Sequence, residues 1–164
     1  MKRIIIAACL AIVAVAVVPV ASASAATGTC HLEGTATFNP ALEFKPKAKV
    51  KYSFKAEGSA NTCVGTGGSQ AVVEASVEGE GNLGCQEGTR ETGTGKLKLS
   101  GEATAKEFSF FFTANGPIVN FSTTGAVTAE GTASFASDPE GLKRCGQMLP
   151  VEALKFQAQA AGSF

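Results

Sequence analysis

The residue types that carry out acid–base and nucleophilic chemistry are scarce in this sequence. It contains one histidine, one aspartate and one tyrosine, and it has no tryptophan. A Ser-His-Asp triad would have to use His31 and Asp138, yet His31 falls on the outward phase of a predicted strand, where a solvated imidazole is ordinary. We therefore expect no catalytic residues and interpret the protein as non-enzymatic.

One glycine pattern matches a cofactor motif in its spelling. Residues 79–84 read Gly-Glu-Gly-Asn-Leu-Gly, the spacing of the dinucleotide-binding fingerprint. That fingerprint works only where a strand passes into a helix whose N-terminus meets the pyrophosphate. Here Cys85 and residues 86–88 (Gln-Glu-Gly) follow, and they do not begin a helix. We expect no bound cofactor.

The N-terminal segment has the pattern of a secretory signal peptide. A short basic region precedes an unbroken apolar run over residues 4–18, and Ala23-Ser24-Ala25 supplies a cleavage pattern. The run is shorter than the ~20 apolar residues that a membrane span needs, so a single anchor is the weaker interpretation. We predict a signal peptide over residues 1–25, cleavage after Ala25, a secreted single β domain over residues 26–164, and no membrane association afterwards.

Four cysteines follow this segment: Cys30, Cys63, Cys85 and Cys145. An even number in an exported chain favours two disulfides. The chain has no C-x-x-C spacing and only one imidazole, so we expect no metal site.

Strand counting predicts how the cysteines pair. In an up-and-down chain Cys30 begins the first strand and Cys63 follows the second, so both lie at one end. Cys85 follows the third strand at the other end, where Cys145 joins it if residues 117–136 form two strands. We predict the disulfides Cys30–Cys63 and Cys85–Cys145. One long strand bent at Gly125 is the alternative for residues 117–136.

The segment after residue 25 alternates between apolar and polar residues almost throughout, as half-buried strands do. The clearest runs are residues 30–38, 49–57, 73–80, 96–99, 108–112, 119–135 and 151–160. Only residues 137–144 look helical, with Ser137 or Asp138 as the cap and Pro139 in the first turn. The pattern predicts an all-β fold of about seven to nine strands, either an antiparallel sandwich or a small closed barrel.

The inward phase of these strands combines glycines with phenylalanines. Gly34, Gly79, Gly125 and Gly131 would weaken the strands unless aromatic rings on neighbouring strands cover them. Eight phenylalanines share the inward phase, and we expect them to fill a small barrel with a solid core: Phe38, Phe54, Phe108, Phe110, Phe112, Phe121, Phe135 and Phe156.

Two strand registers follow from pairing opposite charges and large with small residues. Pairing residues 49–56 with residues 73–80 so that Lys55 faces Glu74 and Lys51 faces Glu78 satisfies every outward charge. This register places Val73 on the inner face.

The second register concerns a hairpin at Asn115-Gly116, with Phe112 opposite Val119. Its outer face would then display a candidate interaction patch, whose members are Phe111, Thr113, Ile118 and Asn120. A partner would bind there if no other part of the chain covers the two apolar side chains.

The spacing of Gly, Phe and Cys also carries a resemblance. Cys30, Gly34 and Phe38, then Cys63 and Cys85, are followed by Gly125-Ala126-Val127 and Phe135. This order resembles small secreted β proteins of actinobacteria, mostly of unknown function. The resemblance implies a bacterial exported β domain and transfers no catalytic residue.

Charge and composition exclude some functions. Fourteen basic residues balance fourteen acidic ones, which argues against a nucleic-acid-binding surface. We interpret the protein as an extracellular module that binds a protein or a cell-envelope component through a sheet face or loops. The alternative is a small barrel that holds an apolar ligand, as lipocalins and avidin do.

Overall fold

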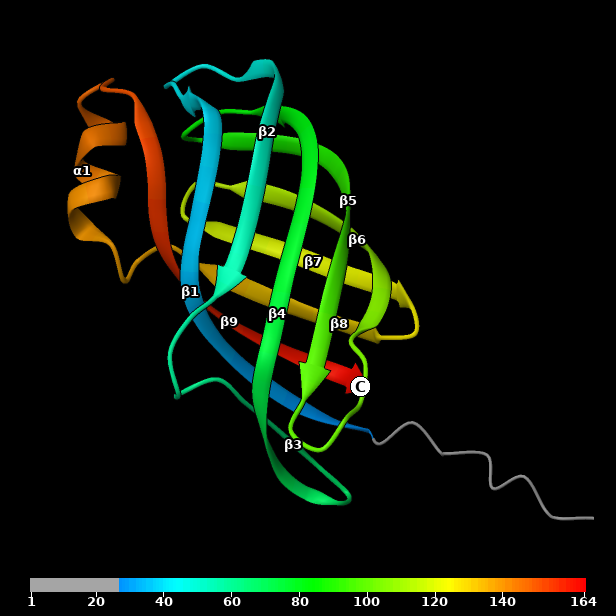
Figure 1. Ribbon diagram of the computed structural model, residues 1–164. Coiled ribbons are helices and arrows are strands. Elements are labelled where there is room, and N and C mark those ends of the chain that lie inside the picture. The colour runs from blue at the N-terminus through cyan, green and yellow to red at the C-terminus, as the bar shows by residue number, and fades with distance from the viewer. Residues whose placement is uncertain (1–26) are drawn as a thin grey trace, which may run out of the picture.

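The computed structural model describes residues 27–164 and shows a closed β-barrel with one short helix outside it (Figure 1). The predicted signal peptide and its cleavage position lie outside the described residues. The elements are β1 (Thr27–Leu42), β2 (Lys47–Ala56), β3 (Thr62–Gly65), β4 (Gly68–Leu83), β5 (Glu87–Leu99), β6 (Lys106–Asn115), β7 (Ile118–Gly125), β8 (Thr128–Ser134), α1 (Pro139–Gly146) and β9 (Val151–Ser163).

The barrel is closed because its last strand pairs with its first. All neighbours are antiparallel, and β9 pairs with both β8 and β1. Eight strands close the ring and β3 is an additional short strand. The all-β prediction is confirmed, and of its two architectures the structure has the barrel.

The strands β2 and β3 share one position in the ring. β2 pairs with residues 34–39 of β1, and β3 pairs with residues 28–31 of the same strand. Both also pair with β4, at residues 76–83 and 68–71 respectively. Together they form one interrupted strand, and residues 57–61 are the interruption.

Both predicted disulfides are confirmed. Cys30 bonds to Cys63, its direct partner in the register of β1 and β3. Cys85, in the turn between β4 and β5, bonds to Cys145 of α1. The second bond is possible because residues 118–134 form two strands, β7 and β8, which turn back at residues 126–127.

The predicted helix is confirmed, and of the two candidate caps the structure uses Asp138, with Pro139 in the first turn. Asp138 is its N-cap, and one carboxylate oxygen accepts a hydrogen bond from the Gly141 amide at 2.9 Å. The other oxygen accepts one from the Lys155 amide at 3.0 Å, which ties α1 to β9. The hydrogen bond from the Lys155 amide, and to a lesser degree that from the Gly141 amide, lowers the pKa of the Asp138 carboxyl group below its ordinary value. Figure 1 shows α1 outside the barrel wall, beside β9.

Aromatic rings cover glycines inside the barrel, as expected. The ring of Phe121 lies on Gly131, and that of Phe108 lies on Gly95. Gly34 has a different role, because the backbone of β2 approaches it too closely to leave room for a side chain. Gly125 has a φ of +115° and ends β7, so it serves a turn and not the core.

The predicted register between β2 and β4 is wrong by two residues. Tyr52 lies opposite Gly79 instead of Val77, and Lys51 lies opposite Glu80 instead of Glu78. The Tyr52 ring needs the space above Gly79 and Gly93, where no side chain competes with it. Burying a tyrosine ring outweighs the ~0.2–1 kcal/mol of each cross-strand ion pair, so packing sets the register.

The inward position predicted for Val73 is also wrong. Val72 pairs with Leu99 and Glu74 pairs with Lys98, so β4 carries one extra residue between these pairs. This bulge turns the Val73 side chain outward, where 63% of its surface is exposed.

The predicted hairpin register of β6 and β7 is wrong by two residues as well. Phe112 pairs with Phe121, and Asn115 pairs with Ile118. The two loop residues are therefore Gly116 and Pro117. The predicted register would place Pro117 in the ladder, where it has no N–H to donate. Gly116, with a φ of +58°, adopts the backbone conformation that the turn requires.

Candidate functional site: an apolar cavity inside the barrel

The barrel interior has two halves that differ in side-chain size. The aromatic half contains Tyr52 and six phenylalanines: Phe38, Phe54, Phe110, Phe112, Phe135 and Phe156. The small-residue half is built mainly from aliphatic and cysteine side chains: Cys30, Cys63, Leu97, Leu99, Val127, Ala129, Ala160 and Phe164. The two halves arise because the inward phase of β8 and of the end of β9 carries alanine and glycine.

A cavity of about 90 Å³ lies where the two halves meet. Phe108, Phe110 and Phe121 line it from β6 and β7, while Ala133 and Ala158 line it from β8 and β9. The expected solid core is therefore wrong in this region. All eight phenylalanines are buried or half-buried, but alanines face several of them and leave space.

The cavity offers a ligand almost no polar contact. Its one buried polar side chain is Thr123. The Thr123 hydroxyl donates to the Val127 carbonyl at 3.0 Å and accepts from the Ala129 amide at 2.9 Å. This hydroxyl is already satisfied by the β7–β8 turn, so the cavity favours an uncharged apolar molecule.

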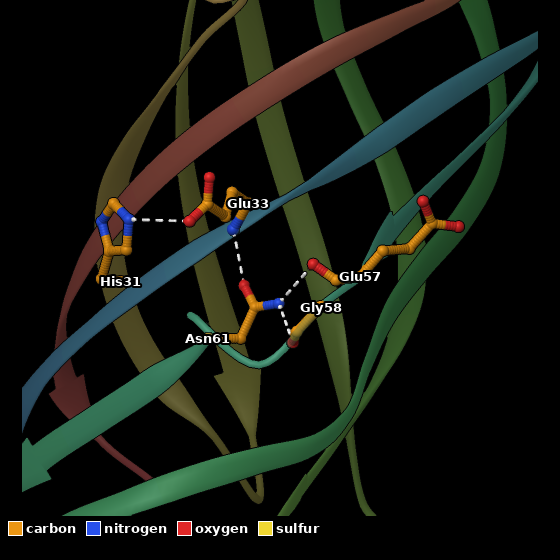
Figure 2. Close-up of polar contacts among 5 residues, drawn as sticks. All are labelled: His31, Glu33, Glu57, Gly58 and Asn61. Carbon is orange, nitrogen blue, oxygen red and sulfur yellow. Dashed lines mark hydrogen bonds and ion pairs between the residues drawn. The ribbon is translucent and has the colours of Figure 1, made fainter.

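A buried asparagine, Asn61, lies at the end of the interruption between β2 and β3 and makes three hydrogen bonds (Figure 2). Asn61 is 2% exposed, and its side-chain oxygen accepts a hydrogen bond from the Glu33 amide at 2.6 Å. Its side-chain nitrogen donates to the carbonyls of Glu57 at 2.9 Å and Gly58 at 3.0 Å. Asn61 therefore bridges β1 and the interruption between β2 and β3, next to the cavity-lining residues Leu32 and Ala56.

A buried acidic side chain, Glu91, also lies at an irregularity of the sheet. Glu91 is 8% exposed and accepts hydrogen bonds from the Asn82 amide at 2.8 Å and the Thr89 hydroxyl at 2.7 Å. It lies where the register of β4 and β5 shifts. Asn61, Glu91 and Thr123 are the buried polar residues of the described chain, and all three satisfy backbone or hydroxyl groups at breaks in the sheet.

Tyr52 is the titratable group that the barrel changes most clearly. Its ring is 3% exposed and its hydroxyl donates to the Thr92 carbonyl at 2.7 Å. Burial, and secondarily the negative charge of Glu91, raise the pKa of Tyr52 from 10.0 to about 12.

We expect this shift to appear directly in a spectrophotometric titration. Because Tyr52 is the only tyrosine and the chain has no tryptophan, phenolate absorbance reports this residue alone. Absorbance should rise near pH 12 in the folded protein and near pH 10 in urea. Since the folded-state pKa is the higher one, this contribution to stability is complete below pH 10 and is lost as the pH rises towards 12. A folded-state midpoint at pH 10 would contradict the buried placement.

The two residues that a catalytic triad would need, His31 and Asp138, each contact a different set of residues. The His31 Nε2 lies 3.8 Å from a carboxylate oxygen of Glu33, and Figure 2 shows this pair on β1. Asp138 caps α1 and binds Lys155. Glycines 79, 81 and 84 belong to β4 and the turn after it, without a following helix.

The predicted interaction patch lies on the outer surface of β6 and β7. Thr113 and Asn120 are paired and exposed, and Ile118 is 40% exposed at the hairpin. Phe111 is half-buried, with the Arg90 guanidinium 5.8 Å from its ring centre, and lies opposite Ser122 instead of Asn120. Three of the four line one shallow depression with Arg90; Ile118 does not.

The sequence favoured a solid core and left a ligand-holding barrel as the alternative, although the small inward side chains of Ala129, Ala133, Ala158 and Ala160 were a signal for the cavity. Within residues 27–164 we find no helix long and apolar enough to cross a membrane. The same residues contain no cluster of three or more His, Cys, Asp or Glu side chains suited to a metal ion.

Comparison with known proteins gives no relative. No protein-family model matches the chain, and neither a curated protein nor a solved structure matches it. The functional argument therefore depends on the geometry alone.

Proposed function

We propose that this protein is a secreted, non-enzymatic barrel that binds a small apolar ligand in its interior cavity. The observation that carries the proposal is the apolar cavity of about 90 Å³ between the two halves of the core. The two disulfides fit an oxidising, extracellular setting, and the predicted signal peptide agrees with it.

The size of the cavity restricts the ligand. Drug-sized ligands occupy pockets of roughly 300–1,000 Å³, whereas an engineered apolar cavity of roughly 150 Å³ binds benzene. A volume of about 90 Å³ suits a single small ring or a short aliphatic segment. The rings of Phe108, Phe110 and Phe121 offer edges and faces for an aromatic contact with such a molecule.

Benzene is a suitable probe for this proposal. A ligand present at ten times its Kd stabilises the folded state by about 1.4 kcal/mol, so benzene should raise the midpoint of urea unfolding measurably. Titration calorimetry should show one site per chain. Native mass spectrometry of protein purified from its own host would test for a retained natural ligand.

A filled cavity should abolish this response. In Ala158→Leu the added carbons enter the cavity from β9, and we expect benzene to lose its effect while the free energy of unfolding stays equal or rises by about 1 kcal/mol. Ala161→Leu makes the same change on the exposed side of the same strand and should leave benzene binding intact. Equal benzene stabilisation in both variants would refute the cavity as the binding site.

A further inference from the structure

A ligand needs a route through the barrel to reach the interior cavity. The strands form a continuous ring of antiparallel pairs, so entry through the wall would break a ladder. On one side of the cavity lies the aromatic half of the core, where Tyr52, Phe54 and Phe112 interlock with ring centres 5.1, 5.8 and 6.0 Å apart. A route there would separate several packed rings. The small-residue half offers the route with the fewest contacts to break.

Phe164 lies at the end of the barrel that the small-residue half closes. It belongs to the same cluster as Leu97, Leu99 and Val127, and it also lines the cavity. Figure 1 shows β9 ending at the same end of the barrel as β5. The side chain of Phe164 is 9% exposed, the largest exposed fraction among the buried residues of this cluster. Its ring therefore separates the cavity from the surface at this end.

Phe164 is also the cavity-lining residue that the sheet restrains least. All the lining residues belong to strands except Val127 and Phe164. Val127 is held in the β7–β8 turn, because its carbonyl accepts a hydrogen bond from the Thr123 hydroxyl at 3.0 Å. Ser163 is the last residue that pairs with β1 and β8, and Phe164 follows it outside both ladders. Among the described residues no turn or side-chain hydrogen bond includes Phe164, so its ring can turn outward without breaking a ladder pair.

We propose that Phe164 is the gate of the cavity and limits the size of the ligand, an inference that rests on the proposed function. With the ring inside, the site is the cavity of about 90 Å³, which suits one small ring. With the ring turned outward, the space of a phenyl group joins the cavity, and the site accepts two fused rings. Turning the ring outward exposes its apolar surface to water. The apparent affinity for a larger ligand is therefore reduced by the fraction of molecules that have the ring withdrawn.

Benzene and naphthalene are the probes for this gate, and Phe164→Ala is the variant. Because the substitution removes the ring, Phe164→Ala should bind naphthalene at least tenfold more tightly than the original protein, as measured by equilibrium dialysis. Bound benzene should exchange with the solvent at least tenfold faster in this variant, as measured by NMR relaxation dispersion. Phe164→Leu keeps part of the side chain, so both of its values should lie between those of the other two proteins.

Leu42→Ala is the matched control, because Leu42 is buried at the opposite end of the barrel, where it pairs with Val151 away from the cavity. It should leave naphthalene affinity and benzene exchange near their original values, with every variant shown to be folded by circular dichroism. If Phe164→Ala binds benzene but both values are unchanged, the gate is overturned and the interior site stands. An equal acceleration of exchange in Leu42→Ala also overturns the gate, because exchange would then follow a general loosening of the barrel. If benzene binds neither the original protein nor Phe164→Ala, the interior site fails and the gate fails with it.

Discussion

Removing the Cys85–Cys145 disulfide by a double substitution to serine should lower the free energy of unfolding by about 4 kcal/mol. The bond spans 60 residues, so it restricts the unfolded chain strongly. It also attaches α1 to the turn between β4 and β5. Urea unfolding of the original protein and the variant, followed by circular dichroism, measures the difference.

The second disulfide supplies a matched comparison. Cys30–Cys63 spans 33 residues, and the shorter loop predicts a smaller loss, by about 0.5 kcal/mol. The paired ladder of β1 and β3 would still hold both positions together without the bond. A larger loss for Cys30→Ser, Cys63→Ser than for Cys85→Ser, Cys145→Ser would contradict the loop-length argument.

Replacing Asn61 with alanine should lower the free energy of unfolding by about 3 kcal/mol. The substitution removes three hydrogen bonds and leaves the part-buried Glu33 amide without its partner. Hydrogen exchange at the Glu33 amide should accelerate together with the loss of stability.

Two further variants test the cause of this effect. Asn61→Asp keeps an oxygen that accepts from the Glu33 amide but turns a buried carboxylate oxygen towards the carbonyls of Glu57 and Gly58, so we expect a loss at least as large as that of Asn61→Ala. Asn120→Ala removes the same side chain from an exposed strand position and should change stability by less than about 0.5 kcal/mol. A loss below about 1 kcal/mol for Asn61→Ala would show that the interruption between β2 and β3 is held by other contacts.

The alternation of side chains predicted most of the secondary structure because it depends only on neighbouring residues. A strand with one face buried must place every second residue inside, and residues 50–56 show this period without exception. Val73 breaks the rule through a bulge, a feature that arises from the partner strand and leaves no mark in the local pattern.

The registers could not be predicted in the same way. Charge pairing favoured one alignment of β2 with β4, but the ring of Tyr52 requires two glycines from two different strands, Gly79 and Gly93. Only the closed barrel shows that β5 brings Gly93 to this place. In the hairpin of β6 and β7 the clue was local, since Pro117 cannot donate within a ladder.

The candidate sites depend on the tertiary structure to different degrees. Phe111, Thr113 and Asn120 were identified as outward residues from sequence, and the structure added Arg90 and Thr132, which come from other strands. The cavity depends on the summed volume of side chains from many strands around a closed ring. The total side-chain volume inside the barrel cannot be read from the pattern of any one strand.

The sequence by itself determined which residues face inward, with the exception of Val73, how the four cysteines pair and where the helix begins, because each follows from periodicity, strand counting or capping. Only the tertiary structure decided that the sheet closes into a barrel, that Asn61 bridges the interruption between β2 and β3, and that a cavity remains. The physical reason is that closure, register and packing volume are properties of residues distant in the chain, and their free energies are realised only when all strands are in place.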